Sequence, residues 1–125
     1  IIMSLSSKAS RTVLKLNNLT KSGELVWKGW LYPIDSLSVV EEIGGNAFIA
    51  SVLEKRFRIY KYTVRHYNAD DDTWDRFPRI RLEFIDEKGK GGWEFPADDR
   101  IVDLMETILF KTSGASEFFD GFLDN

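Results

Sequence analysis

The stretch AFIASVLEKRFRIYKYTVRHY, residues 47–67, decides the fold of this chain. Residues 47–53 and 57–67 are rich in β-branched and aromatic side chains, and residues 54–56 form a short polar turn between them. A further run covers residues 74–85 after the turn cluster at 68–73, and Pro78 within it marks an edge or a bulge. The three runs predict antiparallel strands joined by hairpins.

The sequence on either side of this core extends the sheet. Residues 24–32 alternate between two bulky faces and predict a strand that Pro33 ends, and residues 93–95 predict a short strand ended by Pro96. The glycine-rich segment 86–92 is a hairpin turn that uses glycine for positive φ. Residues 35–43 form either a short helical turn capped by Asp35 or a long connection with a few buried aliphatic side chains.

Helices are predicted at both ends of the chain. Residues 8–21 predict a helix ended by Gly23, with an extended conformation of residues 13–16 as the alternative. Asp98 caps the clearest helix, which Gly114 ends, and Ser116 caps a short last one. The clearest helix has one apolar stripe, formed by Ile101, Leu104, Met105, Ile108 and Leu109. The last helix has apolar residues that are expected to fold back on the protein: Phe118, Phe119, Phe122 and Leu123.

These elements predict an α+β fold in a single domain of residues 1–125. Its twisted antiparallel sheet has four to five strands and is backed by the amphipathic C-terminal helix. In residues 79–85, period-two alternation predicts that one set of side chains points inward and the other outward. The inward set is Ile80, Leu82 and Phe84, and the outward set is Arg79, Arg81 and Glu83.

Composition restricts the classes of function. The chain has 125 residues, 43% of them hydrophobic, and no cysteine, which excludes disulfides and thiolate chemistry and fits a reducing compartment. Its apolar runs are far shorter than the ~20 residues of a membrane span, and its start is too short in its apolar part for a signal peptide. A cytoplasmic protein without a membrane partner is expected. The net charge of −3 counts against a domain built mainly to bind nucleic acid.

The residues for catalysis or metal binding are sparse. His66 is the only histidine, no nucleophile elbow is present, and one histidine cannot anchor a zinc site. The aspartates of residues 70–75 lack the central glycine and final glutamate of a calcium loop. Lys88-Gly89-Lys90 leads into a strand, whereas a phosphate-binding Walker loop opens a helix. We therefore expect no enzyme, metal site or cofactor.

Charge placement is the most informative functional feature. Eight of the 17 basic residues fall on two strands expected to pair, interleaved with aromatic residues. Cations that follow a phosphate backbone, together with aromatic rings on which bases stack, are typical of surfaces that bind single strands. We expect a non-catalytic module binding single-stranded nucleic acid or another polyanion through Arg56, Arg58, Lys61, Arg65, Arg79 and Arg81, with Tyr60, Tyr62 and Tyr67 as stacking platforms. Alternation places Arg58, Tyr60 and Tyr62 on one face, and Lys61 and Arg65 on the other.

Two alternatives remain open for the same residues. Their charges can form cross-strand ion pairs on a solvent face, with the aromatic side chains in the core. The second alternative is a protein-interaction or structural module, such as a homodimer, that uses this aromatic, arginine-rich surface or the 118–123 tail.

Four segments resemble those of small uncharacterised cyanobacterial proteins: LTKSGELVW at 19–27, KRFRIYKY at 55–62, RLEFID at 81–86 and the Leu104-Met105 helix. The fold of that group is similar to the Whirly and positive-cofactor-four class of single-stranded-DNA-binding regulators. The resemblance implies a curved antiparallel sheet backed by a helix. Lys88-Gly89-Lys90 matches the first three letters of the Whirly K-G-K-A-L-L motif, but Gly91 and Gly92 depart from it. No functional residue is carried across.

Overall fold

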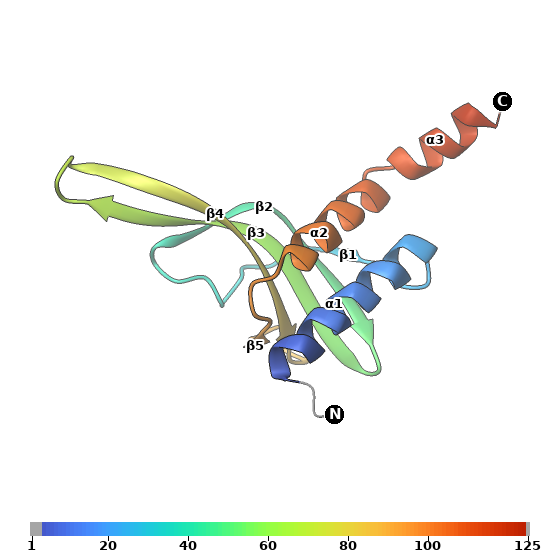
Figure 1. Ribbon diagram of the computed structural model, residues 1–125, viewed down its shortest axis with the longest axis horizontal. Helices are drawn as coiled ribbons and strands as arrows, with labels where there is room; N and C mark the ends of the chain where they lie inside the picture. The colour runs from blue at the N-terminus through green and yellow to red at the C-terminus, as the bar shows by residue number, and fades with distance from the viewer. Residues whose placement is uncertain (1–3, 125) are drawn as a thin grey trace. The chain divides into compact units, whose positions relative to one another are not determined.

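The computed structural model describes residues 4–124, which divide into two compact units (Figure 1). One unit is the sheet of residues 28–97, and the other contains the described residues before and after it. The expectation of a single domain stays a prediction. Together the units give an α+β fold with one antiparallel sheet, as the sequence predicts.

The sheet has five strands in sequence order, and every neighbouring pair is antiparallel. The strands are β1 (Lys28–Trp30), β2 (Glu41–Val52), β3 (Lys55–Asn68), β4 (Thr73–Ile85) and β5 (Gly91–Glu94). The strand expected at 24–32 is shorter than predicted. Residues 31–40 form the connection between β1 and β2, so the long connection, and not a helical turn, is right for residues 35–40. Residues 41–43, expected to belong to the same segment, are part of β2.

The β2–β3 turn is tighter than the sequence indicated. Val52 pairs with Lys55, so the turn consists of Leu53 and Glu54, with φ of 50° and 66°. Positive φ at both central residues is the geometry of a type I′ turn, whose twist matches that of the flanking strands. The expected turn at residues 54–56 is therefore displaced by one residue.

The β3–β4 hairpin continues beyond its neighbouring strands (Figure 1). β2 pairs with β3 only as far as the Glu41–Val64 pair, and β5 pairs with β4 only at Glu83 and Ile85. Residues 65–76, which we call the arm, are consequently a two-stranded ribbon. Pro78 lies on the part of β4 that β5 leaves open, as expected for an edge position.

Both faces of the sheet contain buried side chains. Phe48, Phe57, Ile59 and Leu82 form an apolar face by their pairing register. The opposite face buries charged and aromatic residues: Arg58, Tyr60, Tyr62, Arg81 and Glu83. The prediction that Arg81 and Glu83 point to solvent is wrong, because the 31–40 connection covers this face. Ile34 and Leu37 of that connection pack against Ala47, Tyr60 and Tyr62.

The helical unit begins with α1 (Leu5–Ser22), capped by Ser4 and ended by Gly23 at φ 81°. This confirms the helix expected at 8–21. α2 (Asp99–Thr112) begins as predicted, because the Asp98 side chain accepts a hydrogen bond from the Arg100 amide. Its apolar stripe is largely buried, and α1 and α2 pack together.

The last helix, α3 (Ala115–Leu123), differs from the sequence prediction. Its N-cap is Gly114, at φ 82°, and Ser116 lies inside the helix. α3 buries no residue, and Phe118, Phe119, Phe122 and Leu123 are all at least half exposed. The predicted folding-back of these apolar residues is therefore wrong.

Candidate binding site

Arg58 is the centre of a buried ionic network within the sheet unit. Its side chain is fully buried, and every guanidinium nitrogen donates a hydrogen bond. Nε and Nη2 contact Glu83 Oε2 at 3.0 and 2.8 Å, and Nη2 also contacts Asp35 Oδ1 at 2.9 Å. Nη1 donates to the Gly89 carbonyl at 3.0 Å. Arg58 therefore ties the 31–40 connection and the β4–β5 turn to β3.

Arg81 forms a second network on the same face. It donates to the Tyr60 hydroxyl at 2.8 Å and to Glu41 Oε2 at 3.0 Å, and it forms an ion pair with Glu94 at 3.2 Å. Its guanidinium also lies 4.3 Å from the centre of the Tyr62 ring, within cation–π range. Burial raises the pKa of Tyr60 to about 12. The phenol therefore stays neutral and accepts the hydrogen bond from Arg81.

The nine residues expected to bind a polyanion do not form one surface. The pairing register confirms that Arg58, Tyr60 and Tyr62 lie on the face opposite Lys61 and Arg65. Four members are buried and occupied by internal contacts: Arg58, Tyr60, Tyr62 and Arg81. The other five retain exposed surface: Arg56, Lys61, Arg65, Tyr67 and Arg79.

Arg65 has an internal partner as well. It pairs with Glu42 at 3.3 Å, and Arg76, directly opposite it on β4, reaches the same carboxylate at 3.5 Å. Lys61 is exposed on the same face. Cross-strand ion pairing, one of the two alternatives for these charges, is therefore present in part of the set.

Arg56 lines a pocket of about 430 Å³ between the 31–40 connection and the β4–β5 turn. Tyr32, with 71% of its surface exposed, forms part of the wall. Its ring meets the Trp30 ring edge-on, with centroids 5.1 Å apart and planes at 70°. The guanidinium of Arg58 lies 5.3 Å from the centre of the Trp30 ring. Trp30 is thus held in place and supports an exposed tyrosine.

The β4–β5 turn brings two more cations to this pocket. Asp86 accepts hydrogen bonds from the amides of Lys88 and Lys90, both at 2.9 Å. Gly89, between them, has φ 82° and directs its carbonyl to Arg58. The predicted glycine turn with positive φ is confirmed at Gly89, but it is shorter than the expected residues 86–92, because β5 already begins at Gly91 and not at residue 93. Both lysine side chains are exposed and line the pocket.

The acidic side chains at this pocket are fewer and partly neutralised. Asp35 and Glu87 also line it. The Asp35 carboxylate is paired with Arg58 and accepts the Gly91 amide with both oxygens, at 3.2 and 3.0 Å. Three cations, Arg56, Lys88 and Lys90, therefore surround the aromatic wall.

Sequence reasoning identified only Arg56 among these pocket residues as a binding residue. It missed Trp30, Tyr32, Lys88 and Lys90. A usable signal was present: an aromatic pair immediately precedes Pro33, and a Lys-Gly-Lys turn follows a long strand. No pattern in the sequence indicates that Trp30 and Tyr32 lie next to a turn more than fifty residues further along the chain.

The carboxylates of the networks give a test by pH. Partial burial acts to raise the pKa of Asp35, but hydrogen bonds from Arg58 and the Gly91 amide hold it below 3.8. The pKa of Glu41 is likewise below 4.5, because a backbone amide and Arg81 outweigh its burial. A carboxylate whose pKa is lower in the folded than in the unfolded state contributes its full stabilisation at any pH above the unfolded-state pKa. This contribution is lost as the pH falls through the folded-state pKa.

We therefore expect the free energy of unfolding to fall as the pH drops below about 4.5. Urea denaturation at a series of pH values measures this decline. In an Asp35→Asn/Glu41→Gln variant the decline should be shallower. An identical decline in the variant would show that other carboxylates cause it.

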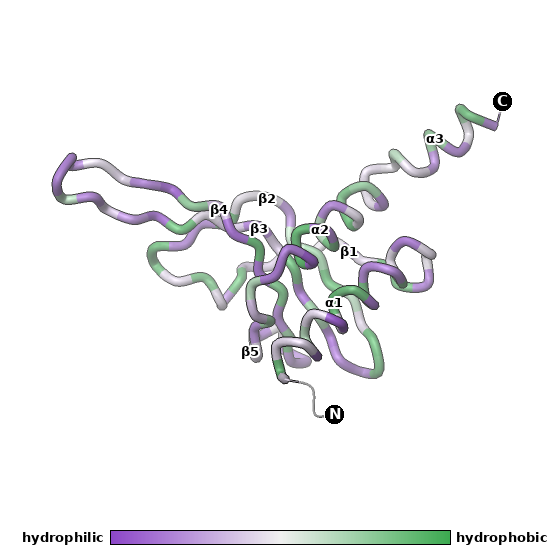
Figure 2. The backbone as a smooth tube through the Cα atoms, viewed as in Figure 1, coloured by the Kyte–Doolittle hydropathy of each residue, from purple (hydrophilic) through white to green (hydrophobic). Residues whose placement is uncertain are grey.

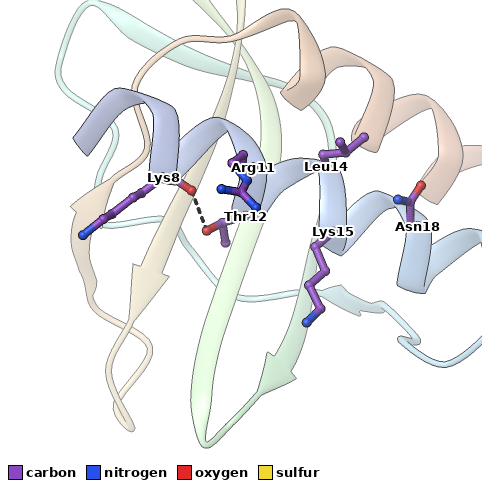
Figure 3. Close-up of a pocket in the computed structure, with 6 residues that line it drawn as sticks. All are labelled: Lys8, Arg11, Thr12, Leu14, Lys15 and Asn18. Carbon is purple, nitrogen blue, oxygen red and sulfur yellow. Dashed lines mark hydrogen bonds between the residues drawn. The ribbon is translucent and has the colours of Figure 1, made fainter. Parts of the chain in front are cut away.

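The remaining surfaces offer less. A cavity of about 620 Å³ along α1 is lined by that helix alone, and Figure 3 shows its side chains, with the Thr12 hydroxyl donating to the Lys8 carbonyl. Among residues 4–124, no group of three or more metal-ligating side chains is arranged to hold an ion. No helix in the same range is long and apolar enough to cross a membrane.

The chain was compared with known protein families, curated proteins and solved structures. No protein-family model, no curated protein and no solved structure matches the chain.

Proposed function

We propose that the protein is a non-catalytic module that binds single-stranded nucleic acid at the pocket formed by Trp30, Tyr32, Arg56, Lys88 and Lys90. The observation that carries this proposal is the exposed Tyr32 ring, supported by Trp30 and surrounded by three cations. A base stacks on an exposed aromatic ring, and flanking cations contact the phosphates on either side.

This proposal keeps the function expected from the sequence and changes its location. The buried members of the expected set serve here as supports: Arg58 holds Trp30, Asp35 and Gly89, which shape the pocket. The net charge of −3 is compatible with a local cationic site, because eleven of the 20 acidic residues lie in the 70–75 loop or after residue 97. We also propose that the protein is related to the Whirly class and that it acts in the cytoplasm.

Removing the platform should weaken binding. For Tyr32→Ala we expect a loss of about 1–3 kcal/mol, roughly 5- to 150-fold in Kd, because one base loses its stacking partner. Fluorescence anisotropy of a labelled single-stranded oligonucleotide measures the affinity. Tyr32→Phe, which keeps the ring, should bind nearly as well as the original protein. Equal losses in the two variants would contradict a stacking role.

The lysines should determine the salt dependence. Each phosphate contact to a single strand contributes about −0.7 to the slope of log K against log salt, so Lys88→Gln/Lys90→Gln should reduce its magnitude by about 1.4. Lys8→Gln/Lys15→Gln on α1 removes the same charge elsewhere and should leave the slope unchanged. Absence of binding by the unaltered protein at low salt would refute the proposed function.

A second candidate function, protein association, is favoured by α3. The rings of Phe118 and Phe122 stack with their centroids 5.6 Å apart, yet both remain mostly exposed, beside Glu117 and Asp120. An exposed aromatic face of this kind is typical of a protein contact. Phe118→Gln/Phe122→Gln removes that face, and sedimentation velocity shows whether self-association depends on it.

A further inference from the structure

The arm and its base have opposite charges at their two ends. The tip has three consecutive aspartates in the β3–β4 turn: Asp70, Asp71 and Asp72. The stem has three cations on one face of the paired strands, Lys61, Arg65 and Arg76, and the last two share the Glu42 carboxylate. Figure 2 shows the hydrophilic residues along this hairpin. Charge therefore changes sign along the length of one ribbon.

Large aromatic side chains lie exposed between the two ends. Tyr67 and Trp74 face each other across the strands with ring centroids 5.3 Å apart, and they are 45% and 55% exposed. Arg65 lies 5.6 Å from the centre of the Trp74 ring. The register places these three residues, Lys61 and Arg76 on one face of the hairpin. Trp, Tyr and Arg are the residue types that dominate protein interfaces.

The arm lacks a covering layer of its own. A two-stranded ribbon is marginally stable in water by itself, and a third layer or strand normally supports it. The tip aspartates would repel a polyanion laid along the arm, so the charge distribution favours a protein with complementary polarity. A second copy of the arm, oriented antiparallel to the first, has this complementary polarity, because its basic stem then lies opposite the acidic tip.

We propose that the face of Tyr67 and Trp74 packs against the same face of a second copy of this chain, with the arms antiparallel about a twofold axis. Such an interface is self-complementary, because each tip then meets the stem of the other copy. The aromatic pairs meet near the axis. The contact is made through the face rather than by adding strands, because the aromatic pair and the cations of the stem lie on that face.

Charge reversal tests this geometry. The tip variant Asp70→Lys/Asp71→Lys and the stem variant Lys61→Glu/Arg76→Glu each place like charges opposite each other at both ends of the interface. We expect each variant alone to dimerise at least about tenfold more weakly than the unaltered protein. An equimolar mixture should regain the dimer, because a positive tip then meets a negative stem and a negative tip meets a positive stem. Sedimentation velocity over a wide concentration range measures all three samples.

Controls separate this interface from other modes of association. Lys8→Glu/Lys15→Glu on α1 changes the net charge as the stem variant does and should leave dimerisation unchanged. Trp74→Ala should abolish the dimer, and circular dichroism checks that it still folds. A concentration-independent monomer, or a dimer that persists in both charge variants, overturns the proposal. None of these outcomes depends on nucleic-acid binding.

Discussion

Replacing Arg58 by methionine is expected to lower the free energy of unfolding by about 3–5 kcal/mol. The substitution leaves Glu83, which is 2% exposed, without its cation. It also removes the donors to Asp35 and to the Gly89 carbonyl. A buried carboxylate without a partner is costly because it has left water without gaining a compensating charge. Denaturant unfolding followed by circular dichroism measures the loss.

A double variant distinguishes loss of the ion pair from loss of packing. In Arg58→Met/Glu83→Met both buried charges are removed, and apolar replacements of similar volume are often neutral or stabilising. We expect the double variant to be more stable than Arg58→Met alone. If it were less stable, the methionine side chains would not fit the space, and the ionic explanation of the single variant would fail.

Gly89→Ala is expected to cost about 2–5 kcal/mol of folding stability, the sum of two effects. A residue with a Cβ at φ 82° is strained by about 1–2 kcal/mol. Its Cβ would also lie 2.5 Å from Cη2 of Trp30, and overpacking of this kind costs about 1–3 kcal/mol. The same denaturation experiment measures the change.

Two other glycines separate these effects. Gly23→Ala has the same positive φ with no atom within 4 Å of the added methyl, so it should show the backbone cost alone. Gly92→Ala meets only a carbonyl oxygen at 3.5 Å, an ordinary contact, and should be nearly neutral. If Gly89→Ala cost no more than Gly23→Ala, Trp30 would be free to move, and its role as a fixed support for Tyr32 would be contradicted.

These two predictions join stability to the proposed function. Arg58 and Gly89 contact Trp30, and Trp30 supports the exposed Tyr32 ring. A site whose walls are held by a buried network loses less conformational entropy when it binds a ligand. We expect both variants to bind an oligonucleotide more weakly than their remaining folded fraction accounts for.

The sequence was sufficient for features that depend on near neighbours. The β3 and β4 runs, the α2 cap at Asp98 and the glycine turn at Gly89 follow from side-chain alternation, capping and positive φ. The sequence predicts a cap at Ser116 because serine favours that position, but α3 begins at Gly114, whose φ lies in the left-handed region. The exposure of α3 has no local signal, because an amphipathic helix has the same pattern whether or not a surface covers it.

By itself, the sequence determined an antiparallel sheet with helices, and a concentration of arginine and tyrosine on two paired strands. Only the tertiary structure decided which of those side chains reach solvent. Period-two alternation separates two faces but does not show which of them is covered. Here the 31–40 connection covers the charged one, because Asp35 and Ser36 supply hydrogen-bond partners to Arg58 from more than twenty residues away. Pairing over such a distance depends on the fold of the intervening chain, which no local pattern encodes.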